Sequence, residues 1–273
     1  MPEKPEVMTV CKALEKQIIN KRITDCNIYW DNIIAKPEPI IFKKNIINQK
    51  IHNIFSKGKF IVIELDDYYL LIHLRMEGKF TFRKINEEKE KHEHVEFILD
   101  NEISWRYRDV RKFGKMYLIE KDKLYEEAPL NKLGYDYYDK DLTGDYLYNK
   151  IHPKKLPIKT VLLDQSIVSG IGNIYDDEIL FLSKISPIRK ASDVSKKECN
   201  LIVNNTKNVL EKAFKLGGTT IKSFTSSEGV HGLFQNELLV HGQVGKKCPN
   251  CNEKIIKIKV GGRGTYYCPK CQK

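Results

Sequence analysis

Four cysteines near the end of this 273-residue chain have the spacing of a metal site. They form two Cys-x-x-Cys pairs with 16 residues between them, namely Cys248, Cys251, Cys268 and Cys271. Two such pairs can place four thiolates tetrahedrally around one Zn²⁺ ion. We predict one structural Zn²⁺ without a catalytic role, because a four-cysteine shell leaves no coordination position open for a substrate. The total of seven cysteines is odd, which argues against a closed disulfide framework.

The second residue could serve as a nucleophile. If the initiator Met1 is removed, Pro2 carries a secondary α-amine, whose pKa is near 7.8, against about 10.4 for a lysine. At neutral pH the neutral fraction of the terminal amine is then roughly a few hundred times larger than that of a lysine side chain. Attack on an aldehyde-level carbon would give a cationic iminium, and the adjacent Glu3 could donate a proton. A start of Met-Pro-Glu is a weak signal when it stands alone.

Two further segments suit a phosphate ligand. Residues 169–173 (Ser-Gly-Ile-Gly-Asn) directly precede an expected helix, and backbone N–H groups at such a start favour an anion. Tyr175 at the third glycine position excludes a dinucleotide fingerprint. A β-ribbon expected over 254–267 turns at two glycines and projects Arg263, whose planar guanidinium suits bidentate phosphate contact. Two alternatives remain. The glycines of residues 169–173 could simply form a corner between two helices, and the zinc-bound tail could only stabilise its domain.

The charge balance also indicates a polyanionic partner. Lys and Arg number 47 against 36 Asp and Glu, a net charge of +11. Residues 245–273 carry eight basic side chains and one acidic one. A Zn²⁺ ion with four thiolates has a net negative charge, and with it the charge of this tail is about +5. With 41% apolar residues the chain can bury a core, which excludes a disordered tail protein. No apolar run approaches the roughly 20 residues of a membrane helix, and no secretory segment is present, so we expect a soluble cytoplasmic protein.

The hydrophobic period divides the chain into a β-rich part and a helical part. Residues 5–19 have helical spacing, and from residue 54 the period becomes two. Strands are expected at 59–65, 69–76, 79–83, 95–99, 103–108 and 113–119. The charged run 86–94 is expected to be a solvated loop. These elements predict a β-sandwich that begins with a helix.

After an acidic, turn-rich segment the period returns to 3.6. Helices are expected at 146–151, 160–166, 175–183 and 195–216. The fold class is therefore α+β multidomain, with an N-terminal β-sandwich and flanking helices, and a C-terminal helical domain that ends in a zinc β-hairpin. The expected domains are 1–133, a linker at 134–146, a helical DNA-binding domain at 147–240 and the zinc finger at 241–273.

In this order the motifs resemble the formamidopyrimidine-DNA glycosylase family, which has an endonuclease VIII branch. The resemblance covers the whole chain and includes a helix–two-turn–helix motif at 170–175. The remaining matching segments are 1–7, 58–60, 73–78, 109–114, 218–222 and 263–268. The sequence departs from the family pattern at Lys4, where the family has a small or apolar residue, and at His241, where it commonly has tyrosine.

The resemblance implies a role for each matching catalytic position. Pro2 would attack C1′ of the damaged nucleoside, and Glu3 would protonate the sugar ring oxygen. Lys59 would contact the phosphate near the lesion and serve in β-elimination, while Arg263 would hold the adjoining phosphate and assist δ-elimination. The outcome would be base excision followed by strand cleavage.

The family also implies which residues contact DNA. Met76, Arg111 and Phe113 would fill the space left by the extruded base, and the arginine could donate to the opposite cytosine. Each of the two apolar residues alone could equally belong to the sandwich core. Phosphate contacts are implied for Lys59, His92, Lys154, Asn173 and Arg263. We leave His73 out as a satisfied strand histidine, and assign no purine contacts in the damaged-base loop at 223–231.

These observations predict a bifunctional DNA glycosylase/AP lyase of base excision repair. It would excise 8-oxoguanine and formamidopyrimidines through a proline Schiff base and cleave the strand by β,δ-elimination. The expected partner is double-stranded DNA with an oxidised base or an abasic site, bound by a monomer. One alternative is an endonuclease VIII-type enzyme for oxidised pyrimidines, whose void-filling loop resembles Gln-Leu-Tyr rather than the residues present here. The other is a catalytically dead zinc-ribbon DNA-binding protein, against which Pro2, Glu3 and Lys59 argue.

Overall fold

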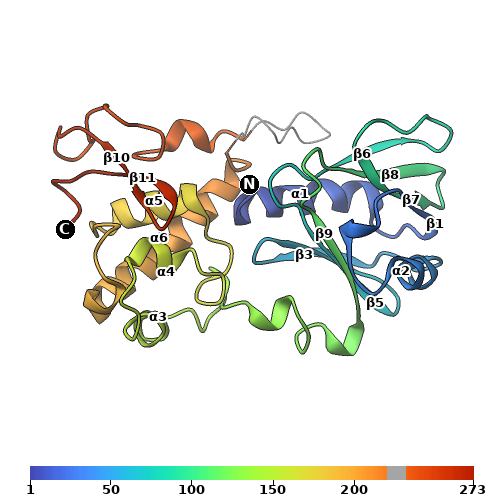
Figure 1. Ribbon diagram of the computed structural model, residues 1–273, viewed down its shortest axis with the longest axis horizontal. Helices are drawn as coiled ribbons and strands as arrows, with labels where there is room; N and C mark the ends of the chain where they lie inside the picture. The colour runs from blue at the N-terminus through green and yellow to red at the C-terminus, as the bar shows by residue number, and fades with distance from the viewer. Residues whose placement is uncertain (220–231) are drawn as a thin grey trace. The chain divides into compact units, whose positions relative to one another are not determined.

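The computed structural model describes residues 1–219 and 232–273, which form two compact units (Figure 1). Unit 1 comprises Met1–Asn131 with Thr219 and Gly232, and unit 2 comprises Lys132–Gly218 and Leu233–Lys273. The damaged-base loop at 223–231 lies outside the described residues. No helix within the described ranges is long and apolar enough to cross a membrane.

Unit 1 contains two β-sheets. One has the strand order β1-β7-β8-β6 and the other has β2-β9-β5-β4-β3, in which only the β2–β9 pair is parallel. The strands are β1 (Ile23–Ile28), β2 (Ile34–Lys36), β3 (Asn53–Lys57), β4 (Phe60–Glu64), β5 (Tyr68–His73), β6 (Lys79–Lys84), β7 (Glu93–Leu99), β8 (Ile103–Arg108) and β9 (Lys115–Glu120). The helices are α1 (Lys4–Ile18) and α2 (Pro39–Ile46), with short 3-10 turns at Asp31–Ile33, Lys121–Lys123 and Leu130–Lys132.

Both sheets contribute to one hydrophobic core. Ile61 of β4 and Phe97 of β7 belong to the same buried cluster, together with Leu14 of α1. The rings of Phe97 and Trp105 lie 4.7 Å apart between their centroids. The predicted β-sandwich with flanking helices is therefore confirmed.

Three predicted strand ends lie in loops instead. β5 ends at His73, because Arg75 has a φ of 53° and the chain turns there. β9 begins at Lys115, which leaves Phe113 in a loop, and Lys59 occupies a turn before β4. Strands β1, β2 and β3 and helix α2 were not predicted. β2 has only three residues, and the burial of β1 does not alternate with a period of two.

The segment expected as a solvated loop at 86–94 ends in buried strand residues. Glu93 and His94 belong to β7, and the Glu93 carboxylate forms a buried ion pair with Arg106 of β8 at 3.1 Å. A charged residue can be buried where a neighbouring strand supplies its counter-ion. The hydropathy of the sequence does not show which strand supplies this counter-ion.

Unit 2 is helical and ends in a β-hairpin. Its elements are α3 (Gly144–Ile151), α4 (Ile158–Leu162), α5 (Asn173–Leu182), α6 (Lys196–Lys215), β10 (Ile256–Val260) and β11 (Arg263–Tyr267), with 3-10 turns at Ala191–Asp193 and Phe234–Glu237. The segment expected as a linker at 134–146 folds within this unit. Tyr135 forms a β-bridge with Val168, and Asp136 is fully buried.

Candidate active site and nucleic-acid contacts

The first residues of the chain lead directly into helix α1. Pro2 and Glu3 are buried, and Pro5 lies in the first helical turn, where its fixed φ suits a helix. The Glu6 carboxylate accepts the backbone N–H of Glu3 at 2.8 Å. It also accepts the backbone N–H and the hydroxyl of Thr219, at 2.8 and 3.1 Å. One buried carboxylate therefore fixes the backbone next to Pro2.

The Met1 amino group, which precedes Pro2 at the start of the chain, has a pKa below its ordinary value of 8.0. Burial is the largest cause, because the charged form loses its hydration. Lys59 and Arg111 lower this pKa further by charge repulsion, whereas Glu3 and Glu6 raise it. All four side chains therefore act on the same amine. A lowered pKa increases the neutral fraction, which is the nucleophilic form.

Lys59 lies in a two-residue turn that joins β3 and β4. The preceding Gly58 has a φ of 54°, a conformation that glycine adopts without a steric penalty. Lys59 itself is buried, with 6% of its surface exposed. A second lysine supports this hairpin, since the fully buried Lys4 donates from Nζ to the backbone carbonyl of Ser56 at 3.0 Å. The residue that departs from the family pattern thus connects α1 to the hairpin that carries Lys59.

His73 lies beside this turn, although the sequence analysis left it out of the site. It pairs with Phe60 across β4 and β5, and the two rings contact each other edge to face at 4.8 Å. Burial, with repulsion from Arg75 and Lys59, lowers the pKa of His73 to about 3. The ring is therefore neutral at physiological pH. Its Nδ1 accepts the backbone N–H of Arg75 at 3.0 Å, which places the ring proton on Nε2.

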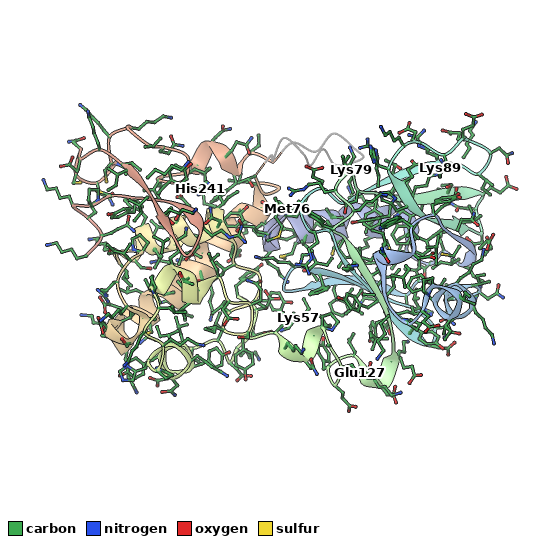
Figure 2. The ribbon with its side chains drawn as sticks, viewed as in Figure 1. Lys57, Met76, Lys79, Lys89, Glu127 and His241 are labelled. Atoms are coloured by element: carbon green, nitrogen blue, oxygen red, sulfur yellow. The ribbon has the colours of Figure 1, made fainter. Side chains whose placement is uncertain are left out.

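The three residues predicted to fill the DNA void lie in two loops of unit 1. Met76, labelled in Figure 2, is half-buried in the loop between β5 and β6. Arg111 and Phe113 lie in the loop between β8 and β9, and Phe113 is 49% exposed. The Arg111 guanidinium lies over the Phe113 ring, with Cζ 4.7 Å from the ring centroid. Phe113 is thus not part of the sandwich core.

His92 lies at the end of the β6–β7 loop, with a φ of 72°. Its backbone carbonyl accepts the N–H of Asp109 at 3.0 Å. The pKa of the ring is lowered by partial desolvation and by the neighbouring cations Lys91, Arg108 and Lys112. These three positive side chains indicate a basic surface around His92.

In unit 2, Asn173 is the first residue of α5. Its amide donates from Nδ2 to the backbone carbonyl of Gly264 in β11 at 3.0 Å. The Gln165 side chain holds the preceding loop, since it donates to the carbonyls of Leu163 and Ile171 and accepts from the N–H of Gly170. Lys154 is half-buried in the loop between α3 and α4.

Arg263 follows the tight turn of the β10–β11 hairpin and is exposed. Gly261 and Gly262 form this turn with φ values of 53° and 78°. A side chain at position 261 would also meet the Thr160 hydroxyl of α4, with its Cβ only 2.6 Å away. The turn therefore requires glycine for its conformation and for its close approach to α4.

The four predicted zinc ligands come together in unit 2. Their Sγ atoms all lie within 4.8 Å of one another, with Sγ–Sγ separations of 3.8 Å for Cys248–Cys271 and 3.5 Å for Cys251–Cys268. Tetrahedral Zn²⁺ with bonds near 2.3 Å requires sulfurs about 3.8 Å apart. Backbone N–H groups of Asn250 and Cys271 point at two of the sulfurs, at 3.4 Å each, as is common around thiolate ligands. The cluster fits the predicted structural zinc.

Comparisons with known proteins identify the family. Residues 1–116 match the formamidopyrimidine-DNA glycosylase N-terminal domain, residues 133–225 match the formamidopyrimidine-DNA glycosylase H2TH domain, and residues 245–273 match the zinc finger found in FPG and IleRS. The chain belongs to the formamidopyrimidine-DNA glycosylase family.

Individual relatives share its full length. The formamidopyrimidine-DNA glycosylase of Oceanobacillus iheyensis is 44% identical and covers 100% of this chain and 98% of its own. The Lactococcus lactis Fpg in complex with DNA containing an abasic site has a TM-score of 0.91 and 37% identity, and covers 99% of both chains. MutM in complex with DNA containing carbocyclic 8-oxo-G also has a TM-score of 0.91 and 37% identity, and covers 100% of both chains.

Two adjacent acids of the helix–two-turn–helix segment were missed by the sequence analysis. The buried Glu178 carboxylate accepts three successive backbone N–H groups, those of Leu239, Val240 and His241, at 2.8 to 3.0 Å. The buried Asp177 pairs with the fully buried Lys159 of α4 and accepts from Nδ1 of His241, labelled in Figure 2, at 2.7 Å. The sequence signal was a run of three acids, residues 176–178, inside an otherwise largely apolar helix.

The structure divides the predicted site residues between the two units. Unit 1 carries Pro2, Glu3, Lys59, Met76, His92, Arg111 and Phe113. Unit 2 carries Lys154, Asn173, Arg263 and the four cysteines. The proposed nucleophile, acid and lysine thus belong to one unit, and the zinc finger with its arginine belongs to the other.

Proposed function

We propose that this chain is a bifunctional DNA glycosylase/AP lyase that removes oxidised purines, chiefly 8-oxoguanine opposite cytosine and formamidopyrimidines. The observation that carries the proposal is the buried start of the chain, where Pro2 and Glu3 are shielded from solvent and Lys59 lies close enough to repel a positive charge on the Met1 amine. Removal of Met1 would leave the secondary amine of Pro2 in this shielded position, beside the Glu3 carboxyl group and Lys59, and such an arrangement suits Schiff base chemistry. Relatives solved with abasic-site DNA and with 8-oxo-G DNA support the choice of substrate.

The reaction begins once Met1 has been removed. The Pro2 nitrogen attacks C1′ of the damaged nucleoside, and the bond from C1′ to the base breaks with its electron pair leaving on the base, which takes up the proton that the Pro2 nitrogen loses. Glu3 donates a proton to the ring oxygen, so that the sugar opens and a cationic iminium forms between Pro2 and C1′. Because Glu3 is buried, with 3% of its surface exposed, this proton transfer would take place away from bulk water.

Strand cleavage follows from the iminium. This cation acidifies the hydrogen on C2′, and Lys59 assists its removal, so that the 3′ phosphate leaves by β-elimination. A second proton loss from the sugar expels the 5′ phosphate by δ-elimination, with Arg263 holding that phosphate. Hydrolysis of the remaining Schiff base returns the Pro2 amine and releases the sugar fragment.

Binding to the lesion requires both loops of unit 1 and the basic surface of unit 2. Met76 and Phe113 occupy the space of the extruded base, and Arg111 donates hydrogen bonds to the orphaned cytosine. Phosphates are held by Lys59, His92, Lys154, Asn173 and Arg263. In this proposal the protein acts as a monomer on double-stranded DNA in the cytoplasm.

The proposal is tested by reduction of the enzyme–DNA mixture with borohydride. We expect a covalent adduct with a duplex that contains 8-oxoguanine opposite cytosine, and its peptide should map to Pro2. An undamaged duplex serves as the control and should give no adduct. An adduct at Lys59, or none, would overturn the assigned nucleophile. A strong preference for oxidised pyrimidines would instead indicate endonuclease VIII-type activity.

A further inference from the structure

The loop that carries Arg111 and Phe113 is organised around one buried carboxylate. Asp109 is 1% exposed, and its Oδ1 accepts the backbone N–H of Arg111 at 3.0 Å. Its Oδ2 accepts the N–H groups of Phe113 and Gly114, at 2.9 and 2.8 Å. The loop therefore wraps around a side chain that itself points away from solvent.

The backbone of Asp109 fixes the same loop to the sheet. Its N–H donates to the carbonyl of His92 at 3.0 Å, and its carbonyl accepts from Nε2 of the buried His94 at 2.8 Å. His92 is one of the proposed phosphate contacts. Asp109 thus connects a proposed phosphate contact to two proposed void-filling residues.

Tyr107 of β8 lies beneath both void-filling loops. A Cβ at Gly114 would lie 1.8 Å from the Tyr107 hydroxyl oxygen, and a Cβ at Gly78 would lie 2.2 Å from the same atom. Gly78 closes the loop that carries Met76, since its N–H donates to the carbonyl of Leu74 at 3.0 Å. The glycine backbones of the two loops therefore meet at one buried hydroxyl.

From this arrangement we propose that Asp109 and Tyr107 are positioning residues that hold the two void-filling loops together as one preformed wedge. The inference rests on the proposed function, because it concerns the extrusion of a stacked base. Base extrusion costs stacking and pairing energy, and a wedge that is already ordered does not have to lose further conformational freedom on insertion. Neither residue has to touch the DNA for this purpose.

Substitution of Asp109 by asparagine is the direct test. The side chain keeps its size, but its amide nitrogen cannot accept, so at least one of the three backbone N–H groups loses its partner. We expect single-turnover excision of 8-oxoguanine opposite cytosine to fall at least about tenfold. Cleavage of a duplex with a preformed abasic site, where no base is extruded, should fall less than about threefold.

A fluorescent base gives a second readout. With 2-aminopurine placed next to the lesion, wild-type enzyme should raise the fluorescence as the stack opens, and the Asp109→Asn variant should raise it more slowly. Tyr107→Phe removes the hydroxyl shared by the loops and should slow the same step to a smaller extent, which keeps the test open if Asp109→Asn fails to fold. Asp100→Asn, at an exposed turn of the same sheet, is the matched control and should behave as wild type.

Two results would overturn the inference. In the first, Asp109→Asn and Tyr107→Phe excise 8-oxoguanine and open the stack at the wild-type rate. In the second, excision and abasic-site cleavage fall by the same factor, which indicates a general structural role. Failure of the wild-type enzyme to form the Pro2 adduct would count against the proposed function rather than against this inference.

Discussion

At the residue scale, the proposed chemistry depends on charged groups that are kept out of water. In unit 1, Lys59 repels a positive charge on the Met1 amine and on His73, and burial lowers the pKa of both the amine and the histidine. The amine and the histidine therefore favour their neutral forms more than they would in water. Arg263 is the opposite case, because it is exposed at a hairpin turn. A side chain in that position can add a phosphate contact without a desolvation cost.

The proposed contact of Arg263 can be measured through the salt dependence of DNA binding. Arg263→Ala should reduce the slope of log K against log[salt] by about 1, since one phosphate contact releases about one counter-ion. Lys16→Ala removes one positive charge from the exposed side of α1 and should leave the slope unchanged. Equal slopes for Arg263→Ala and wild type would show that Arg263 does not reach a phosphate.

At the element scale, the zinc hairpin is docked on helix α5 by two neighbouring carboxylates. Glu178 accepts three backbone N–H groups from the segment that leads into the zinc finger, and Asp177 accepts the N–H of Tyr266 in β11 at 3.3 Å. Asn173 adds a third contact through the carbonyl of Gly264. The position of Arg263 within unit 2 is therefore set by α5 as well as by the metal.

Glu178→Gln tests this docking. The amide nitrogen would face at least one backbone N–H, so we expect unit 2 to lose about 1–3 kcal/mol of its free energy of unfolding. Glu237→Gln is the control, because Glu237 is exposed and its ion pair with Lys212 is exposed on both sides. That variant should stay within about 0.5 kcal/mol of wild type. The measurement is denaturant unfolding of both variants and of wild type. Equal midpoints for Glu178→Gln and wild type would mean that the three contacts do not stabilise the unit.

At the scale of the whole molecule, the proposed nucleophile, acid and lysine belong to one unit, and the zinc ligands with Arg263 belong to the other. Unit 1 has its own core, formed by both sheets and α1, and includes no zinc ligand. Cys248 and Cys268 belong instead to a small cluster with Phe181 of α5 and Val240. Loss of the metal should therefore disturb unit 2 and leave the core of unit 1 in place.

Removal of zinc with a chelator tests that division. We expect DNA binding to be abolished, because the hairpin loses its four-thiolate anchor. Both tryptophans of the chain, Trp30 and Trp105, lie in unit 1, so their fluorescence spectrum should not change. Addition of Zn²⁺ should restore binding. If DNA binding persists after the metal has been fully released, the hairpin stabilises the protein but does not contact the DNA.

The sequence by itself determined the features that depend on local spacing. Two Cys-x-x-Cys pairs define the ligands of the zinc finger, and the change of hydrophobic period separates the sandwich from the helical part. The family follows from a set of short motifs spread over the whole chain. The spacing of metal ligands and the period of a helix or strand are each set within one segment of the chain, so the sequence pattern predicts them.

Only the tertiary structure showed which buried polar groups support the candidate site. Lys4 reaches Ser56 across 52 positions of the chain, and Glu6 reaches Thr219 across 213. The sequence also did not decide whether Phe113 is exposed, because an aromatic residue suits a core as well as a loop. A buried charge needs a partner of suitable geometry, and the fold brings that partner from a distant element. For this reason the proposed roles of Asp109 and Tyr107, and the contacts of Glu178, became visible only in three dimensions.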